Sequence, residues 1–435
     1  MRLIRLLKSD LARETAEWVG DDVITVSQAE EICARYGADY HQASSRSLGY
    51  NVLVVFGYLF IGLAVITLLG ANWDDIPRAL RMGGLVVLTA CTQGFAVYLN
   101  SQGKQSVAVG IFLLGNLFFG ASIILIAQIY HLGEHMPDGV FWWALGCLPF
   151  GLLTKNPLIT LQANLLAIIW FYLEVSVGFY PTLFPVFIMG SLFVLYRGQG
   201  SILLLLTSVA SIGLWMEYAL AEIWRSSRHF TFEPEHVAVS VASFILLYTF
   251  SHWLNQRNTV ATQDYGAVLS VWSLRFGLLF LLVFSFEDPW ESLINANWEH
   301  LPSTFAFVGV LAMSALLLAY RSSKLKIVAS ILVFYLASFL AVLLTENDVH
   351  APLFQLMYNL ALISAGVTLI IKGIHSGISH YFFLGIATIL LVALMRYIDL
   401  IGDYVGGAML FILCATLLLG AARYWKGYLA KGDHP

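Results

Sequence analysis

The sequence predicts an all-α polytopic membrane protein, a bundle of about 12–14 transmembrane helices preceded by a short cytoplasmic helical segment. The composition is the first reason, because 59% of the residues are hydrophobic and only 11% are charged. A soluble domain carries about 25% charged residues, so a soluble protein is excluded. The second reason is a series of apolar stretches of about 20 residues, the length that crosses a bilayer, with short polar connectors between them. The alternating ten-residue pattern of barrel strands is absent, and helices satisfy their backbone polar groups within each span.

The distribution of lysine and arginine is the third reason. With the N-terminus placed in the cytoplasm and the connectors counted alternately, 17 of the 23 basic residues fall on the cytoplasmic side and 5 on the other side. The remaining one, Arg275, falls inside a span. Basic residues are retained in cytoplasmic loops, so the asymmetry predicts that both termini are cytoplasmic.

The chain divides into a cytoplasmic helical segment at 1–47, a transmembrane domain at 48–425 and a cytoplasmic tail at 426–435. Within the first segment, Ser27 and Glu30 form a predicted capping box at the start of the second of two short helices. The first of these helices is basic and carries an apolar stripe, so it lies on the membrane surface or packs on the next helix. Such a segment indicates a docking element for a protein partner.

The predicted spans, in chain order, are 50–70, 81–99, 107–127, 140–154, 157–173, 181–196, 202–222, 236–254, 266–286, 304–320, 325–344, 353–371, 380–396 and 405–423. The spans at 140–154 and 157–173 are short and are separated by Asn156 and Pro157, so a re-entrant pair is the alternative.

The first outer turn is a candidate site that contains Asn72, Trp73 and Asp74, followed by Arg78 and Arg81. In a structural interpretation, Trp73 lies in the interfacial aromatic belt and Asp74 or Asp75 caps the second span, where both arginines can pair with carboxylates. In a functional interpretation, Asp74 is an outward carboxylate that binds a cation or acts as a base.

Polar side chains also occur in and just after the third span, at Asn116, Gln128, Tyr130 and His131. Asn116 lies in a glycine-rich stretch that permits close helix approach, so it is either a polar contact between helices or a residue that lines a pore or pocket. The four residues are therefore candidate binding or pore-lining residues.

The sequence from His131 to His135 matches the H-x-x-E-H pattern of zinc proteases, with Glu134 as the acidic residue. That chemistry needs both histidines on one helical face, whereas Gly133 and Pro137 indicate a loop. No metal site and no cofactor are therefore predicted. The sequence contains no nucleotide-binding motif and no basic patch interleaved with aromatic residues, so nucleic-acid binding is excluded.

Arg275 lies near the centre of a predicted span, where a charge is costly and is usually paired or faces water. Glu217, Glu174 and Asp399 are the candidate partners. Nearer the C-terminus, Arg396 and Asp399 are three residues apart and form a predicted pair on one helical face. Arg275 is a candidate functional charge, and the Arg396–Asp399 pair is a candidate structural contact.

Two motifs resemble signatures of an uncharacterised bacterial membrane family, domain of unknown function 2157. The first is Asn72-Trp73-Asp74 with Ile76-Pro77, Arg78 and Arg81, and the second is the stretch from Ala127 to Gly133. The last hundred residues are similar to the C-terminal part of such proteins. The resemblance implies a bacterial inner-membrane protein with no assigned activity. It singles out seven positions: Asn72, Trp73, Asp74, Pro77, Gln128, Tyr130 and His131.

Three classes of function stay open from the sequence. The first is transport or permeation of a small solute or ion, with Asp74 and His131 at an outward mouth and Arg275 as a counter-charge. The second is a non-catalytic scaffold or subunit that docks through residues 1–47. The third is a membrane-embedded transferase acting on the outer face, which needs titratable residues that converge within hydrogen-bond reach.

Overall fold

The computed structural model describes residues 5–35, 40, 53, 56–57, 60–62, 64, 67, 77–130, 135–224, 233–257, 259–345, 347–377, 379–399, 412, 415–416 and 419–420. The chain forms two compact units, Met1–Ser208 (unit 1) and Val209–Pro435 (unit 2), and each is described by itself.

A helical hairpin opens unit 1, formed by α1 (Arg5–Gly20) and α2 (Val26–Arg35). The capping box of α2 lies two residues before the predicted one. The side chain of Thr25 accepts a hydrogen bond from the backbone N–H of Gln28 at 3.3 Å, and that of Gln28 accepts one from the N–H of Thr25 at 2.9 Å. The predicted box of Ser27 and Glu30 is therefore wrong, because Ser27 already lies inside the helix. A protein partner for this segment stays a prediction.

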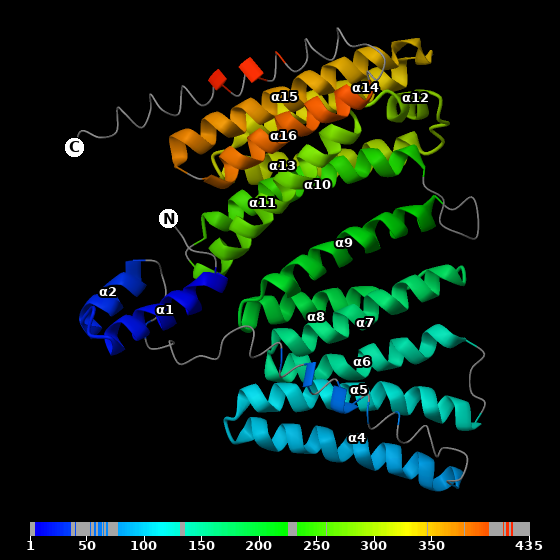
Figure 1. The fold of residues 1–435 in the computed structure, drawn as a ribbon. Helices are drawn as coiled ribbons and strands as arrows, with labels where there is room; N and C mark the ends of the chain where they lie inside the picture. The colour runs from blue at the N-terminus through cyan, green and yellow to red at the C-terminus, as the bar shows by residue number, and fades with distance from the viewer. Residues whose placement is uncertain are drawn as a thin grey trace. The chain divides into compact units, whose positions relative to one another are not determined.

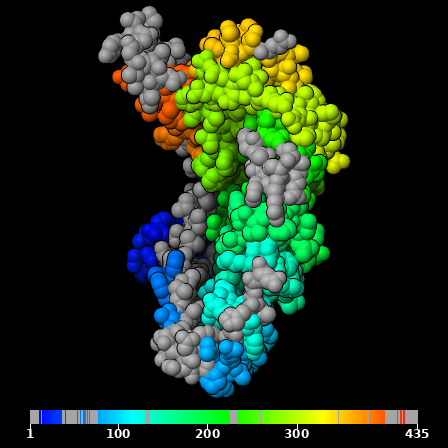
Figure 2. All heavy atoms as spheres, turned by 90° about the vertical axis from the view of Figure 1, so that its right-hand side faces the viewer, coloured from blue at the N-terminus to red at the C-terminus, as the bar shows by residue number. Residues whose placement is uncertain are grey.

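Five further helices of unit 1 follow in chain order and pack against their sequence neighbours (Figure 1). They are α4 (Arg78–Ser101), α5 (Gln105–Tyr130), α6 (Met136–Thr154), α7 (Pro157–Ser176) and α8 (Phe184–Arg197). Short connections make consecutive helices antiparallel, and the end at which α5 and α7 finish faces the viewer in Figure 2.

Helices α6 and α7 correspond to the two short predicted spans. They contain 19 and 20 residues, which gives each a length of about 28–30 Å, close to the thickness of the hydrocarbon core. The turn between them is sharp because Lys155 adopts a left-handed conformation, and the Asn156 side chain then caps α7. Only α7 is among the helices long and apolar enough to cross a membrane, so whether the pair forms two spans or a re-entrant pair stays open.

Unit 2 takes most of α9 (Ile202–Ile223) and all the later elements. These are α10 (Pro234–Asn255), α11 (Val260–Val283), α12 (Asp288–Ile294), α13 (Leu301–Arg321), α14 (Leu325–Leu344), the 3-10 turn η2 (Asp348–His350), α15 (Ala351–Ser376) and α16 (Ser379–Asp399). The short α12 was not predicted. It follows α11 and packs on α14 and α15 through the buried Trp290.

The structure confirms the predicted all-α fold. Among the described residues, ten helices are long and apolar enough to cross a membrane, and α8 is a shorter apolar helix. The ninth predicted span, 266–286, corresponds to α11. This helix begins earlier, at Val260, because the side chain of Thr259 caps it there. The first and last predicted spans, 50–70 and 405–423, lie largely outside the described residues.

Charged residues gather at two ends of unit 2. The end where α10, α13 and α15 finish, here called the basic end, carries Arg257, Arg321, Lys324, Lys326 and Lys372. The end where α10 and α13 begin, here called the acidic end, carries Glu233, Glu235, Glu287, Asp288, Glu291 and Glu299. The charge asymmetry read from the sequence is therefore a feature of the folded unit 2.

Helices α15 and α16 approach closely at glycines. A Cβ atom on Gly385 would lie 2.5 Å from the carbonyl oxygen of Gly366 and 2.9 Å from the backbone nitrogen of Ile370. Both atoms belong to the backbone of α15, so a larger residue at Gly385 forces the helices apart. Small residues at membrane helix interfaces allow this kind of approach.

Gly385→Ala is therefore expected to destabilise the protein by about 1–3 kcal/mol, the range for overpacked sites. Gly309→Ala on α13 is the matched control, because a Cβ there meets no atom within 4 Å. Unfolding of the two purified variants, followed by circular dichroism during heating, measures the difference. Equal unfolding temperatures for the two variants would contradict the close contact between α15 and α16.

Candidate functional site

A partly open cavity of about 770 Å³ lies in unit 2. Its walls come from α10, α11, α14 and α15, with Tyr381 of α16 at one end and Trp290 and Trp298 towards the other. This volume lies within the range of about 300–1,000 Å³ for small-molecule sites.

The cavity extends along almost all of α14, from Lys324 at its N-cap to Val342 in its last turn. At a rise of 1.5 Å per residue, this stretch of helix is about 27 Å long. The hydrocarbon core of a bilayer is about 30 Å thick. The cavity is therefore nearly as long as the hydrocarbon core is thick.

The wall of this cavity is apolar, although several serines line it. Ser273 donates its hydroxyl to the carbonyl of Ser270 at 3.3 Å, and Ser338 donates to that of Phe334 at 2.8 Å. Ser270 and Ser330 likewise donate to carbonyls three residues earlier in their own helices. Because these four donors are already engaged, the middle of the cavity offers few hydrogen-bond donors to a bare anion.

Positive charge is concentrated where the cavity meets the basic end of unit 2. Lys324, Lys372 and His252 line this part, and no described lining residue is Asp or Glu. The Lys372 ammonium lies 4.5 Å from the centroid of the Tyr381 ring, and the two lysines are close enough to repel each other. The Nε2 atom of His252 is buried and has no hydrogen-bond partner among the described residues. This region suits an anionic group that accepts hydrogen bonds.

A polar network occupies the acidic end. Glu217 of α9 accepts a hydrogen bond from the Ser240 hydroxyl at 2.8 Å, and its other oxygen lies 2.9 Å from Nδ1 of His236. His236 is 2% exposed, and Trp224 packs edge-on against its ring. These contacts join the end of α9 to the first turns of α10.

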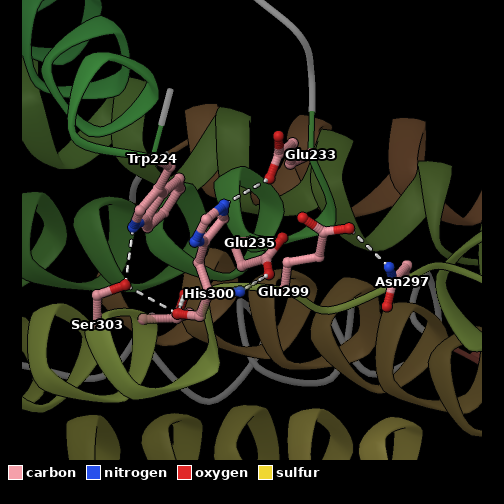
Figure 3. A network of polar contacts seen from close by, with 8 residues as sticks. Trp224, Glu233, Glu235, Asn297, Glu299, His300 and Ser303 are labelled. Carbon is pink, nitrogen blue, oxygen red and sulfur yellow. Dashed lines mark hydrogen bonds and ion pairs between the residues drawn. The ribbon is translucent and has the colours of Figure 1, made fainter. Parts of the chain in front are cut away.

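Figure 3 shows the adjoining part of this network around His300, the residue that precedes α13. Its backbone N–H donates to Glu235 at 2.9 Å, and its Nε2 lies 3.6 Å from a carboxylate oxygen of Glu233. Trp224 stacks on the His300 ring with an interplanar angle of 4° and donates its indole N–H to Ser303 at 2.8 Å. The network therefore connects α9, α10 and α13 through side chains.

The geometry does not match nucleophilic catalysis. Ser240 donates to Glu217, and Ser303 donates to the carbonyl of His300, so neither hydroxyl is bonded to an imidazole. Titratable groups do converge here, as a transferase requires, but a serine paired with a histidine is absent among the described residues of this network, and the base nearest to a hydroxyl is the Glu217 carboxylate beside Ser240.

Glu235 is the most deeply buried carboxylate of the network, with no exposed surface, and it accepts the N–H of His300. Glu235→Ala leaves that buried N–H without an acceptor and is expected to lower the free energy of unfolding by about 1–3 kcal/mol. Glu299→Ala is the control, since Glu299 is exposed and its hydrogen bond within the described part of the chain is to Asn297. Thermal unfolding of both variants checks this, and equal stabilities would contradict it.

The polar residues of the third predicted span differ from one another in burial. Asn116 is fully buried on α5, accepts a hydrogen bond from Gln93 of α4 at 2.8 Å and donates one to Gln162 of α7 at 2.8 Å. It thereby links three helices within unit 1. Gln128 and Tyr130 are exposed at the end of α5, and the Tyr130 hydroxyl lies 3.6 Å from the sulfur of Met82.

Arg275 is exposed on α11 and does not line the cavity. Its guanidinium lies 5.4 Å from the Trp272 ring, and Glu217 bonds His236 and Ser240 instead. The Arg396 guanidinium lies 4.8 Å from the Phe286 ring, whereas the side chain of Asp399 is outside the described residues.

The first outer turn is not described. Asn72, Trp73, Asp74 and His131 all lie outside the described residues, so their candidate binding roles stay predictions. The predicted cap of the second span is wrong, because the N-cap residue of α4 is Pro77. Arg78 is exposed and Arg81 is half-buried at the start of α4.

The structure also brings together residues that the sequence patterns did not connect. His135, Asp138 and Glu174 each offer a ligand atom, and these atoms lie within 4.8 Å of one another. Among the described residues, this group can hold a metal ion. Its members come from the beginning of α6 and the end of α7, so no sequence spacing reveals it.

Residues 16–160 match the family model described as "Predicted membrane protein (DUF2157)". The match confirms the resemblance over a third of the chain, and the description states no activity. No curated protein and no solved structure matches the chain.

Proposed function

We propose that this protein is a transporter of the bacterial inner membrane that carries an anionic phospholipid through the cavity of unit 2. The observation that supports this most directly is the cavity itself. It is apolar along about 27 Å of helix and has two lysines and a histidine at one end.

The lining favours a lipid over a bare ion. An anion crossing the membrane needs hydrogen-bond donors in place of its hydration shell, whereas four of the five serines in this wall donate to carbonyls of their own helices, and the two lysines disfavour a cation. An acyl chain needs no such groups. The phosphate of an anionic lipid can accept hydrogen bonds from Lys324, Lys372 and the Nε2–H group of neutral His252.

The positive-inside rule indicates on which side of the membrane the basic end lies. Lysine and arginine collect at this end of unit 2, so we place it in the cytoplasm, with both termini on the same side. The lipid head then binds at the level of the inner leaflet, and the network around His300 lies at the outer end.

The test uses the purified full chain reconstituted in vesicles that contain a phosphatidylglycerol with a fluorescent NBD group on its acyl chain. Dithionite added outside reduces only the label that reaches the outer leaflet. We expect label from the inner leaflet to be reduced as well when the protein is present. Reduction that stops at the outer leaflet, as in protein-free vesicles, would refute transport of this lipid class.

A further inference from the structure

We propose that His135, Asp138 and Glu174 form a binding site for a divalent transition-metal ion, with Zn²⁺ as the best-matched ion. The site lies in unit 1, at the end where α6 begins and α7 finishes. It is independent of the cavity in unit 2 and does not rest on the transport proposal.

Two packed helices fix the three residues. His135 is the N-cap residue of α6, in an extended conformation, and Asp138 lies in the first turn of the same helix. Glu174 lies in the last turn of α7, which packs along α6. The buried Pro137 lies two residues after His135 and restricts the backbone at the start of α6.

The distances agree with zinc coordination. Zn–N and Zn–O bonds are about 2.0–2.2 Å, so two ligand atoms of a tetrahedral zinc lie about 3.4 Å apart. Nε2 of His135 and Oε2 of Glu174 are 3.1 Å apart. The Asp138 carboxylate lies within 4.8 Å of both, so a small side-chain rotation completes a set of three ligands.

Neighbouring aromatic residues hold the ligands in place. The indole N–H of Trp170 donates to Oε2 of Glu174 at 3.2 Å, and Phe179 packs edge-on to the His135 ring with centroids 5.4 Å apart. Such outer contacts orient metal ligands and affect metal affinity by about 10- to 100-fold.

The charges also favour a cation. Glu174 is largely buried, with 14% of its side chain exposed, and within the described residues neither it nor Asp138 forms an ion pair with a lysine or arginine. A divalent ion would compensate the two carboxylates. One imidazole and two carboxylates suit zinc or manganese rather than a thiol-seeking ion, and three protein ligands leave a position for water.

The test titrates ZnCl₂ into the purified full chain in detergent, without a polyhistidine tag, and measures binding by calorimetry. Co²⁺ replaces Zn²⁺ in a parallel titration, because its visible absorption reports tetrahedral geometry. We expect one saturable site. We expect Glu174→Gln and Asp138→Asn each to weaken it at least tenfold, since both keep the side-chain size but remove a charged ligand.

Glu217→Gln is the matched control. Glu217 contacts His236 at 2.9 Å, much as Glu174 contacts His135, but that pair has no third ligand among the described residues. Zinc affinity that is unchanged in Glu217→Gln and reduced in the two site variants supports the proposal. An absence of saturable binding, or equal affinity in all variants, would overturn it and leave His135–Glu174 as a hydrogen bond that joins two helix ends.

Discussion

Gly277→Phe is expected to slow lipid movement while leaving the protein folded. Gly277 lies on α11 in the wall of the cavity, and a Cβ added there meets no atom within 4 Å. The phenylalanine ring therefore projects into the space that the acyl chain would occupy. Phenylalanine also has a higher helix propensity than glycine, so α11 itself is not weakened.

Overpacking a site costs about 1–3 kcal/mol. If this cost falls on the lipid-bound state, the transfer rate drops by roughly 5- to 150-fold. The dithionite assay on reconstituted vesicles measures this rate.

Gly309→Phe is the control for this variant. A Cβ added at Gly309 also meets open space, but this glycine lies on the exposed face of α13 and not in the cavity wall. We expect wild-type transfer from it. Equal rates for the two variants would place the route of the lipid outside the cavity.

The sequence predicts the membrane-spanning helices well because the energetic penalties that define them are large. A span must pair its own backbone groups and avoid charge, so hydropathy alone locates α13 and α14 to within a few residues. Helix caps are less certain. Thr25 with Gln28 and Ser27 with Glu30 both fit a capping pattern, and small differences in local geometry decide which forms.

The candidate sites are harder to predict because they depend on contacts between distant segments. Glu235 lies on α10 and His300 immediately before α13, and Asp138 and Glu174 come from different helices. Lys372 does carry a signal, since a lysine in the last turns of an apolar helix marks an interface. The sequence does not show that Lys372 shares a cavity with Lys324 and His252. This arrangement results from the packing of α10, α14 and α15.

The double variant Lys324→Gln with Lys372→Gln is expected to weaken the binding of anionic lipids selectively. Each lysine near an anionic headgroup contributes about 1 kcal/mol, so losing two of them lowers the affinity for phosphatidylglycerol by roughly 30-fold. Phosphatidylcholine, whose head carries no net charge, should bind to the variant and to the wild type alike. Native mass spectrometry of delipidated protein with each lipid measures both affinities.

Lys326→Gln is the matched control, because Lys326 is two residues from Lys324 and exposed but does not line the cavity. Its affinity for phosphatidylglycerol should be that of the wild type. If the double variant loses both lipids equally, the lysines maintain the shape of the cavity and do not recognise the headgroup. Gly277→Phe should give the opposite result. A ring among the acyl chains should weaken the binding of phosphatidylglycerol and of phosphatidylcholine to the same extent. If the double lysine variant loses affinity for phosphatidylglycerol alone and Gly277→Phe loses affinity for both lipids, the headgroup is recognised at the basic end and the acyl chain binds along α14.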